Sequence, residues 1–165
     1  MRTPSDKALN LLKYVEELNL FPYDDQTGAA ITTWCSGATI GYGHWISVDE
    51  WPHFCDGITK EDAEVLFLQD LSPTVVCIES NVHVPLDQNQ FDALLILVFN
   101  IGVGSFRRSS LLKLINNPYC SGSNYPTKEL AWKAFKKKDG VVNKGLENRR
   151  ACEWNIWDRN IYKKW

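Results

Sequence analysis

Residues 16–25 read EELNLFPYDD, and within this stretch a helical pattern ends and a strand-like pattern begins. Upstream, apolar residues such as Leu9 and Leu12 recur with a helical period, so the sequence predicts an amphipathic helix over Ser5–Leu18. Downstream, over Phe21–Ile46, glycines alternate with β-branched and aromatic residues, which predicts short hairpin strands. The stretch therefore marks the junction between a helix and a small sheet.

Glu16 interrupts the apolar face of this helix. It continues the row of Leu9 and Leu12, whereas Glu17 lies four residues after Lys13, where an exposed ion pair is expected. A carboxyl at the edge of an apolar surface should have a raised pKa, and such a group can act as a general acid. The alternative is a structural role, in which Glu16 frays at the helix end or pairs with a distant arginine.

The rest of the chain has mainly helical patterns. Thr59 is an N-cap candidate for a helix that runs through Leu71, and Pro73 is expected to break or kink this helix. A capping-box pattern from Asp87 opens a strongly apolar helix, which Gly102 ends. Further helices are expected near residues 110–115, 129–137 and 143–159. A small sheet followed by many helices is an α+β arrangement with the sheet at one end.

Composition limits the function classes. The chain has 165 residues, is 44% hydrophobic and 23% charged, and has a net charge of -2, which is typical of a globular protein and argues against a dedicated nucleic-acid binder. No apolar stretch approaches the roughly 20 residues of a membrane span, and the first residues do not resemble a signal peptide. We therefore expect synthesis in the cytoplasm and no stable membrane insertion.

The five cysteines, Cys35, Cys55, Cys77, Cys120 and Cys152, lie far apart. They have no C-x-x-C pair and no histidine at metal-ligand spacing, so the sequence predicts no metal site and no cofactor. An odd number leaves at least one thiol unpaired, and the sequence leaves the disulfide connectivity open.

Three residue types suggest glycosidase chemistry. Asp25 follows the helix in a turn region, and Thr39 opens the motif T-I-G-Y-G-H. A helix-end Glu16, a loop Asp25 and a strand Thr39 facing one another would let one carboxylic acid protonate a glycosidic oxygen while the other carboxylate orients water. Asp24 is the rival of Asp25, although a turn aspartate that caps its own backbone is the simpler interpretation.

Five blocks of sequence carry a resemblance. They are E-x-L-x-L-x-x-Y-x-D from Glu16, T-I-G-Y-G-H from Thr39, P-L-x-Q-N-Q-F-D-A-L from Pro85, F-N-I-G from Phe99 and N-R-R-x-x-E from Asn148. In this order, across nearly the whole chain, they resemble the phage-type lysozymes: endolysins of tailed phages and related muramidase domains.

The resemblance implies a lysozyme-like fold and hydrolysis of the β-1,4 bond between N-acetylmuramic acid and N-acetylglucosamine in peptidoglycan. It implies one catalytic domain over residues 1–165, with a sheet lobe at about 19–58 and a helical lobe at about 1–18 and 59–165. Glu16 matches the catalytic acid, Asp25 the second carboxylate and Thr39 the residue that holds the attacking water. Arg149 matches an arginine beside the acid, which would lower the pKa that burial raises.

Five further residues are expected to line the substrate cleft: Tyr42, Gly43, His44, Phe99 and Asn100. His44 is expected to contribute a hydrogen bond rather than act as a base, because the Glu–Asp pair fills both catalytic roles.

The chain departs from the family between Asp25 and Thr39. Thirteen residues, Gln26–Ala38, separate them, where the family pattern is shorter. Within this insertion Trp34 either packs in the hairpin, which we favour, or stacks on a saccharide. Thr32 and Thr33 become rivals of Thr39 for the water-holding hydroxyl.

For the mechanism, the resemblance favours inversion. The alternatives are retention with Asp25 as nucleophile, lytic transglycosylation, and a binding-only module. The expected partners are the glycan strands of peptidoglycan, and we expect the protein to be a monomer. Whether an immunity protein binds the cleft is left open by the sequence. The wall lies outside the cytoplasm, so a holin, a phage tail or a secretion apparatus would have to deliver the protein to the periplasm or to a target cell wall.

Overall fold

The first helix ends close to the predicted position. The computed structural model describes residues 2–120, 122–138 and 140–165. Helix α1 covers Asp6–Glu16, two residues shorter at its end than the sequence predicted. Glu17 ends it, because its φ of 53° lies in the left-handed region that terminates many helices. Glu16 is therefore the last helical residue, immediately before the chain turns.

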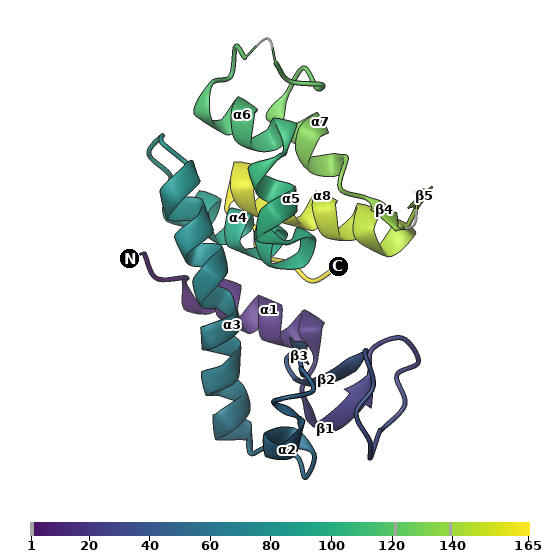
Figure 1. Cartoon of the computed structure of the whole chain (residues 1–165). Coiled ribbons are helices and arrows are strands. Elements are labelled where there is room, and N and C mark those ends of the chain that lie inside the picture. The colour runs from purple at the N-terminus through teal and green to yellow at the C-terminus, as the bar shows by residue number, and fades with distance from the viewer. Residues whose placement is uncertain (1, 121, 139) are drawn as a thin grey trace. The chain divides into compact units, whose positions relative to one another are not determined.

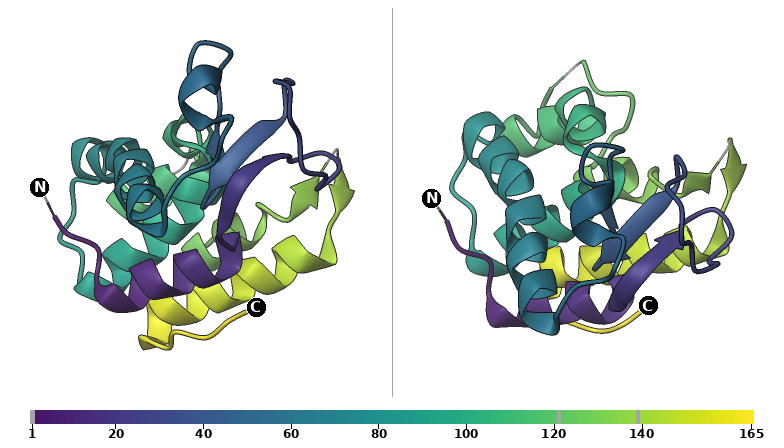
Figure 2. Two further views of the ribbon diagram at one scale, coloured as in Figure 1. Left: turned by 90° about the horizontal axis from the view of Figure 1, so that it is seen from below. Right: turned by 60° about the horizontal axis from the view of Figure 1, so that its bottom comes forward.

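The chain then forms the small antiparallel sheet that the sequence predicted (Figure 1). Strands β1 (Asn19–Asp24), β2 (Ala38–Gly41) and β3 (His44–Trp45) are ordered β1-β2-β3. Thr39 of β2 is paired with Tyr23 of β1 on one side and with Trp45 of β3 on the other. Figure 2 shows β1 and β2 side by side from two further directions.

All four residues of β2 are buried, and one of its faces packs in the core of the sheet unit. Ala38 and Ile40 are fully buried together with Ile46, and partly buried residues such as Trp51 and Leu66 pack against them. Trp51 belongs to the short helix α2 (Trp51–Phe54), and Leu66 to the long helix α3 (Lys60–Asn81). Because side chains alternate along a strand, Thr39 lies on the opposite face of the sheet from Ala38 and Ile40.

Helix α3 begins at its predicted cap. The amide of Asp62 donates to the Thr59 hydroxyl at 3.1 Å, and the amide of Thr59 donates to the Asp62 carboxylate at 3.3 Å. Of the break or kink expected at Pro73, the break does not occur: the helix continues through Pro73 to Asn81.

The chain forms two compact units. The sheet unit is Leu12–Ser72, and the helical unit combines Met1–Leu11 with Pro73–Trp165. Both α1 and α3 thus contribute residues to each unit.

Helix α4 (Gln88–Ile101) is the centre of the helical unit. Its residues from Phe91 to Val98 are buried on all sides, as expected for a helix that is apolar all round. It packs against α8 (Lys144–Arg159), on which α7 (Lys128–Lys133) also packs. The remaining elements are the helices α5 (Val103–Arg107) and α6 (Ser110–Asn116) and the hairpin of β4 (Lys137–Lys138) and β5 (Val141–Val142).

Asp92 connects both ends of the chain within the helical unit. It is fully buried in α4, and its carboxylate accepts the amide of Ser5 at 3.1 Å and the phenol of Tyr162 at 2.6 Å. A buried carboxylate needs such donors, so Asp92 holds an N-terminal and a C-terminal segment at one point. In the described part of the chain, no helix has both the length and the apolar character needed to cross a membrane.

Candidate active site

The predicted triad Glu16, Asp25 and Thr39 lies entirely within the sheet unit. Glu16 is half-buried at the end of α1, Asp25 is exposed in the turn after β1, and Thr39 is buried in the middle strand. The left-handed backbone conformation of Glu17 ends the helix, so β1 begins shortly after Glu16.

Asp25 is held against the backbone of β2. Its amide donates to the carbonyl of Gly37 at 2.9 Å, and the Gln26 side-chain amide donates to its carboxylate at 2.7 Å. A Cβ on Gly37 would come 2.7 Å from Asp25 Oδ1 and 2.2 Å from Asp24 Oδ1, so a residue with a side chain does not fit here without movement of both carboxylates. Gly37 therefore provides the space in which the Asp25 carboxylate lies.

Asp24 has the structural role that the sequence favoured. Its carboxylate accepts the backbone amide of Gln26 at 3.1 Å and the hydroxyl of Thr27 at 2.9 Å. These contacts form a turn in which an aspartate caps its own backbone, which leaves Asp25 as the exposed carboxylate.

Thr39 lies two residues beyond Gly37 on the same strand. Its side chain is 5% exposed, and its hydroxyl donates to the Gly37 carbonyl at 3.0 Å. Since a hydroxyl has one proton, a water at Thr39 would meet the oxygen as an acceptor. The rivals Thr32 and Thr33 are exposed in the insertion, outside the sheet.

The phenol of Tyr23 is influenced by the charges of both carboxylates. Burial raises the pKa of its phenol, and the charges of Asp25, Glu16 and Glu17 raise it further. The phenol therefore lies within electrostatic range of the helix end and of the turn, and stays a neutral hydrogen-bonding group at physiological pH. The sequence motif contains Tyr23, but its position among these carboxylates comes from the pairing of β1 with β2.

The expected cleft residues Tyr42 and His44 bind carboxylates of the sheet unit. The Tyr42 phenol donates to Glu64 at 2.9 Å, and its ring packs on Phe67 with centroids 5.2 Å apart. Gly43, between the two residues, is exposed with a φ of 94°.

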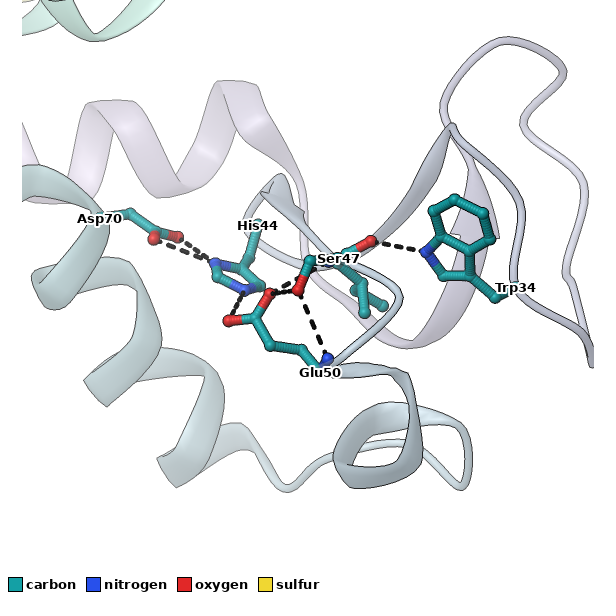
Figure 3. A network of polar contacts seen from close by, with 6 residues as sticks. Trp34, His44, Ser47, Glu50 and Asp70 are labelled. Carbon is teal, nitrogen blue, oxygen red and sulfur yellow. Dashed lines mark hydrogen bonds and ion pairs between the residues drawn. The ribbon is translucent and has the colours of Figure 1, made fainter.

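His44 lies between two acidic groups (Figure 3). Its Nδ1 is 3.0 Å from Asp70 Oδ1, and its Nε2 is 3.9 Å from Glu50 Oε1. The hydrogen bond to Asp70 raises the pKa of the imidazole, although burial acts in the opposite direction. A contact of Tyr42, Gly43 or His44 with substrate stays a prediction.

Two tryptophans fasten the insertion to the strand region after Gly43. The indole N–H of Trp34 donates to the carbonyl of Ile46 at 2.9 Å (Figure 3), and that of Trp45 donates to the carbonyl of Ser36 at 2.9 Å. Each ring thus binds the backbone of the segment that carries the other ring. Trp34 is 37% exposed, so its role in hairpin packing, which the sequence favoured, stays a prediction.

The remaining predicted residues belong to the helical unit. Arg149 donates from Nε to Glu153 at 3.2 Å, and its guanidinium lies 4.8 Å from the centre of the Trp165 ring. Asn100 accepts a hydrogen bond from Arg150 at 2.7 Å. Phe99 is half-buried in α4.

A buried ion pair in this unit was not recognised from the sequence. Glu153 is fully buried and accepts from Arg150 at 2.8 Å and from the Trp132 indole at 3.0 Å. The N-R-R-x-x-E block places Arg150 and Glu153 three residues apart, on one helix face. That spacing in the sequence indicates an ion pair of Arg150 with Glu153, beside the role expected for Arg149.

Among the residues that the structure describes, no group of three or more His, Cys, Asp or Glu side chains could hold a metal ion. The five cysteines are free thiols in the described chain.

Comparison with known proteins places this arrangement in a family. The model of the phage lysozyme family matches residues 13–153. The endolysin of Acyrthosiphon pisum secondary endosymbiont phage 1 is 38% identical over 93% of this chain and 97% of its own length.

Two solved structures have the same fold. The endolysin from Escherichia coli O157:H7 phage FAHEc1 has a TM-score of 0.77 at 32% identity, covering 99% of this chain and 98% of that one. The muramidase domain of SpmX from Asticaccaulis excentricus has a TM-score of 0.72 at 29% identity, covering 96% and 99%. The chain belongs to the phage lysozyme family.

Proposed function

We propose that Glu16, Asp25 and Thr39 are the catalytic residues with which this lysozyme hydrolyses the β-1,4 bond between N-acetylmuramic acid and N-acetylglucosamine. Family membership makes the protein a glycoside hydrolase that lyses peptidoglycan. The observation that carries the assignment is a pair of hydrogen bonds at Gly37. Its carbonyl oxygen accepts both the Asp25 amide and the Thr39 hydroxyl.

The two carboxyl groups have surroundings that suit different roles. Glu16 is half-buried at a helix end, and Asp25 is exposed to solvent. A proton donor works best in the less polar surroundings, and a carboxylate that orients water works best where water reaches it. We therefore assign proton donation to Glu16 and water activation to Asp25.

In the proposed reaction, Glu16 gives its proton to the glycosidic oxygen as the bond from that oxygen to C1 breaks. A water bound by the Asp25 carboxylate and the Thr39 oxygen attacks C1, and its proton passes to Asp25. The products are two free sugar ends, and the proton returns from Asp25 to Glu16 through solvent. Attack by water on the face opposite the leaving group gives inversion.

The test is the loss of turbidity of purified peptidoglycan. Glu16→Gln should lower the rate about a thousandfold or more, because it removes the proton donor. Glu17→Gln is the matched control, since it changes the adjacent exposed carboxylate and should leave the rate unchanged. Normal lysis by Glu16→Gln would exclude the assignment.

Product analysis separates the mechanisms. Inversion releases the α-anomer of the new reducing end, which proton NMR detects before mutarotation, whereas retention releases the β-anomer. Anhydromuramyl ends in the mass spectrum would instead identify a lytic transglycosylase.

Delivery completes the proposal. We propose that a holin lets the protein reach peptidoglycan, and a phage tail or a secretion apparatus would serve the same purpose. Expression in a bacterial host with and without a holin tests this: lysis should require the holin, and lysis without it would contradict holin-dependent delivery.

A further inference from the structure

Trp45 is a large apolar side chain held open to solvent. It is 55% exposed, although the next residue, Ile46, is fully buried in the core of the sheet unit. Large aromatic side chains bury extensive apolar area when they bind another molecule, so an exposed tryptophan is a candidate contact for a ligand.

The register of the sheet places Trp45 beside the proposed catalytic face. Thr39 is directly opposite Trp45 in β3 and directly opposite Tyr23 in β1. Directly opposed residues in antiparallel strands have side chains on the same face, with Cβ atoms about 5 Å apart. Tyr23, Thr39 and Trp45 therefore form one row across the sheet, on the face opposite the buried Ala38 and Ile40.

The indole of Trp45 is fixed in place. Its N–H donates to the carbonyl of Ser36 at 2.9 Å, and Ser36 immediately precedes Gly37, over which Asp25 lies. The reciprocal bond from Trp34 to Ile46 fastens the same two segments. A ring that is already oriented loses little conformational entropy when it binds a ligand.

We propose that Trp45 is a stacking platform for a pyranose ring of the glycan strand, at a subsite next to the scissile bond. The C–H face of a pyranose is apolar and packs on an aromatic ring, while its hydroxyls stay in water. The occupant is a glycan because Trp45 is the cross-strand neighbour of Thr39, so a strand whose reacting carbon reaches Thr39 passes over this row. This inference rests on the proposed role of Thr39 and Asp25.

The insertion Gln26–Ala38 creates this platform. Ser36, which accepts from the Trp45 indole, and Trp34, which fastens the hairpin, both belong to it. The residues between Asp25 and Thr39 thus orient a substrate-binding ring, and one of them, Gly37, also binds the Asp25 amide.

Binding measured without turnover tests the proposal. In the Glu16→Gln background, peptide-free glycan strands prepared by amidase treatment are titrated by calorimetry. Trp45→Ala should raise the dissociation constant about tenfold, and Trp45→Phe, which keeps an aromatic face, should raise it less. Tyr119→Ala, at a 95% exposed aromatic residue of the helical unit, is the matched control and should bind as the parent does.

Trp45→Met separates stacking from packing, because methionine fills space without a flat ring. Weak binding by Trp45→Met at an unchanged melting temperature supports the platform. Parent-like binding by Trp45→Ala or Trp45→Met overturns it. Failure of the proposed function would appear instead as normal lysis by Glu16→Gln, whatever the residue at position 45.

Discussion

Asp25 occupies the space that a side chain at Gly37 would fill. A Cβ at position 37 would come 2.7 Å from Asp25 Oδ1 and 2.2 Å from Asp24 Oδ1, and the Asp25 amide donates to the Gly37 carbonyl at 2.9 Å. The positions of both carboxylates thus depend on the absence of one carbon atom at Gly37.

Gly37→Ala should therefore displace Asp25 and lower the rate of peptidoglycan lysis at least about tenfold, since small misplacements of catalytic groups are costly. The turbidity assay measures this, with circular dichroism to confirm the fold. Gly104→Ala is the control, because the added Cβ would come no closer than 3.6 Å to its neighbours. An unchanged rate for Gly37→Ala would show that the position of Asp25 tolerates the shift.

Thr39→Val removes the hydroxyl and keeps the shape of the side chain. The Gly37 carbonyl keeps its bond from the Asp25 amide, so the fold should survive. We expect lysis to fall about 10²-fold, as for the loss of one preorganised polar group, and Thr39→Ser to recover most of it. Equal rates for the valine and serine variants would remove the hydroxyl from the mechanism.

The pair of His44 and Asp70 should make stability depend on pH. The hydrogen bond to Asp70 raises the pKa of His44 in the folded state. A raised histidine pKa stabilises the fold fully below about pH 6.5, its ordinary value, and this contribution is lost as pH rises through the folded pKa.

Asp70→Asn should therefore lower the free energy of unfolding by about 1.5–3 kcal/mol at pH 5.5, the range for hydrogen bonds to charged groups, and by less at pH 9. Urea unfolding at both pH values measures the difference. A loss that is the same at both would mean that the charge of His44 does not contribute.

Glu17 has a backbone conformation that suits glycine. A non-glycine residue in the left-handed region costs about 1–2 kcal/mol of stability. Glycine avoids this cost, but the greater entropy of the unfolded chain offsets part of the gain. Glu17→Gly should therefore keep or raise the melting temperature, while Glu17→Val should lower it by several degrees. Thermal melts followed by circular dichroism decide, and a large loss of stability in Glu17→Gly would contradict the role of the φ of 53°.

Glu153→Gln would leave the buried guanidinium of Arg150 without its carboxylate partner. Breaking a buried ion pair in this way costs about 3–5 kcal/mol. Glu147→Gln provides the comparison, because Glu147 lies on the surface of the same helix, pairs with Lys136 and Lys144, and should matter far less. Similar unfolding free energies for the two variants would show that the buried pair contributes little.

Local signals made most of the fold predictable. Thr59, the predicted cap, accepts the Asp62 amide within the first turn of α3, so a few neighbouring residues determine where this helix begins. The sheet was equally predictable, because its turns and alternating side chains lie within one short segment. At Pro73 the sequence predicted a break or a kink, and the helix that continues to Asn81 excludes only the break.

The surroundings of the site were less predictable, because they depend on contacts between distant residues. Asp70 lies 26 positions from His44, and Glu64 lies 22 positions from Tyr42, and neither acid has a pattern that identifies its partner. The relation of Gly37 to Asp25 likewise arises only when β1 and β2 pair. Motifs were enough to propose Glu16, Asp25 and Thr39 as site residues, whereas the groups that contact Asp25 and Thr39 could not be predicted.

The contacts of Asp92 have a consequence for synthesis. Its carboxylate binds Ser5, which precedes the sheet unit in the sequence, and Tyr162, which follows it. Because Tyr162 leaves the ribosome after Ser72, the contacts of Asp92 form only when all residues of the sheet unit are already available. The segment that carries Glu16, Asp25 and Thr39 therefore emerges before the helical unit can close around Asp92.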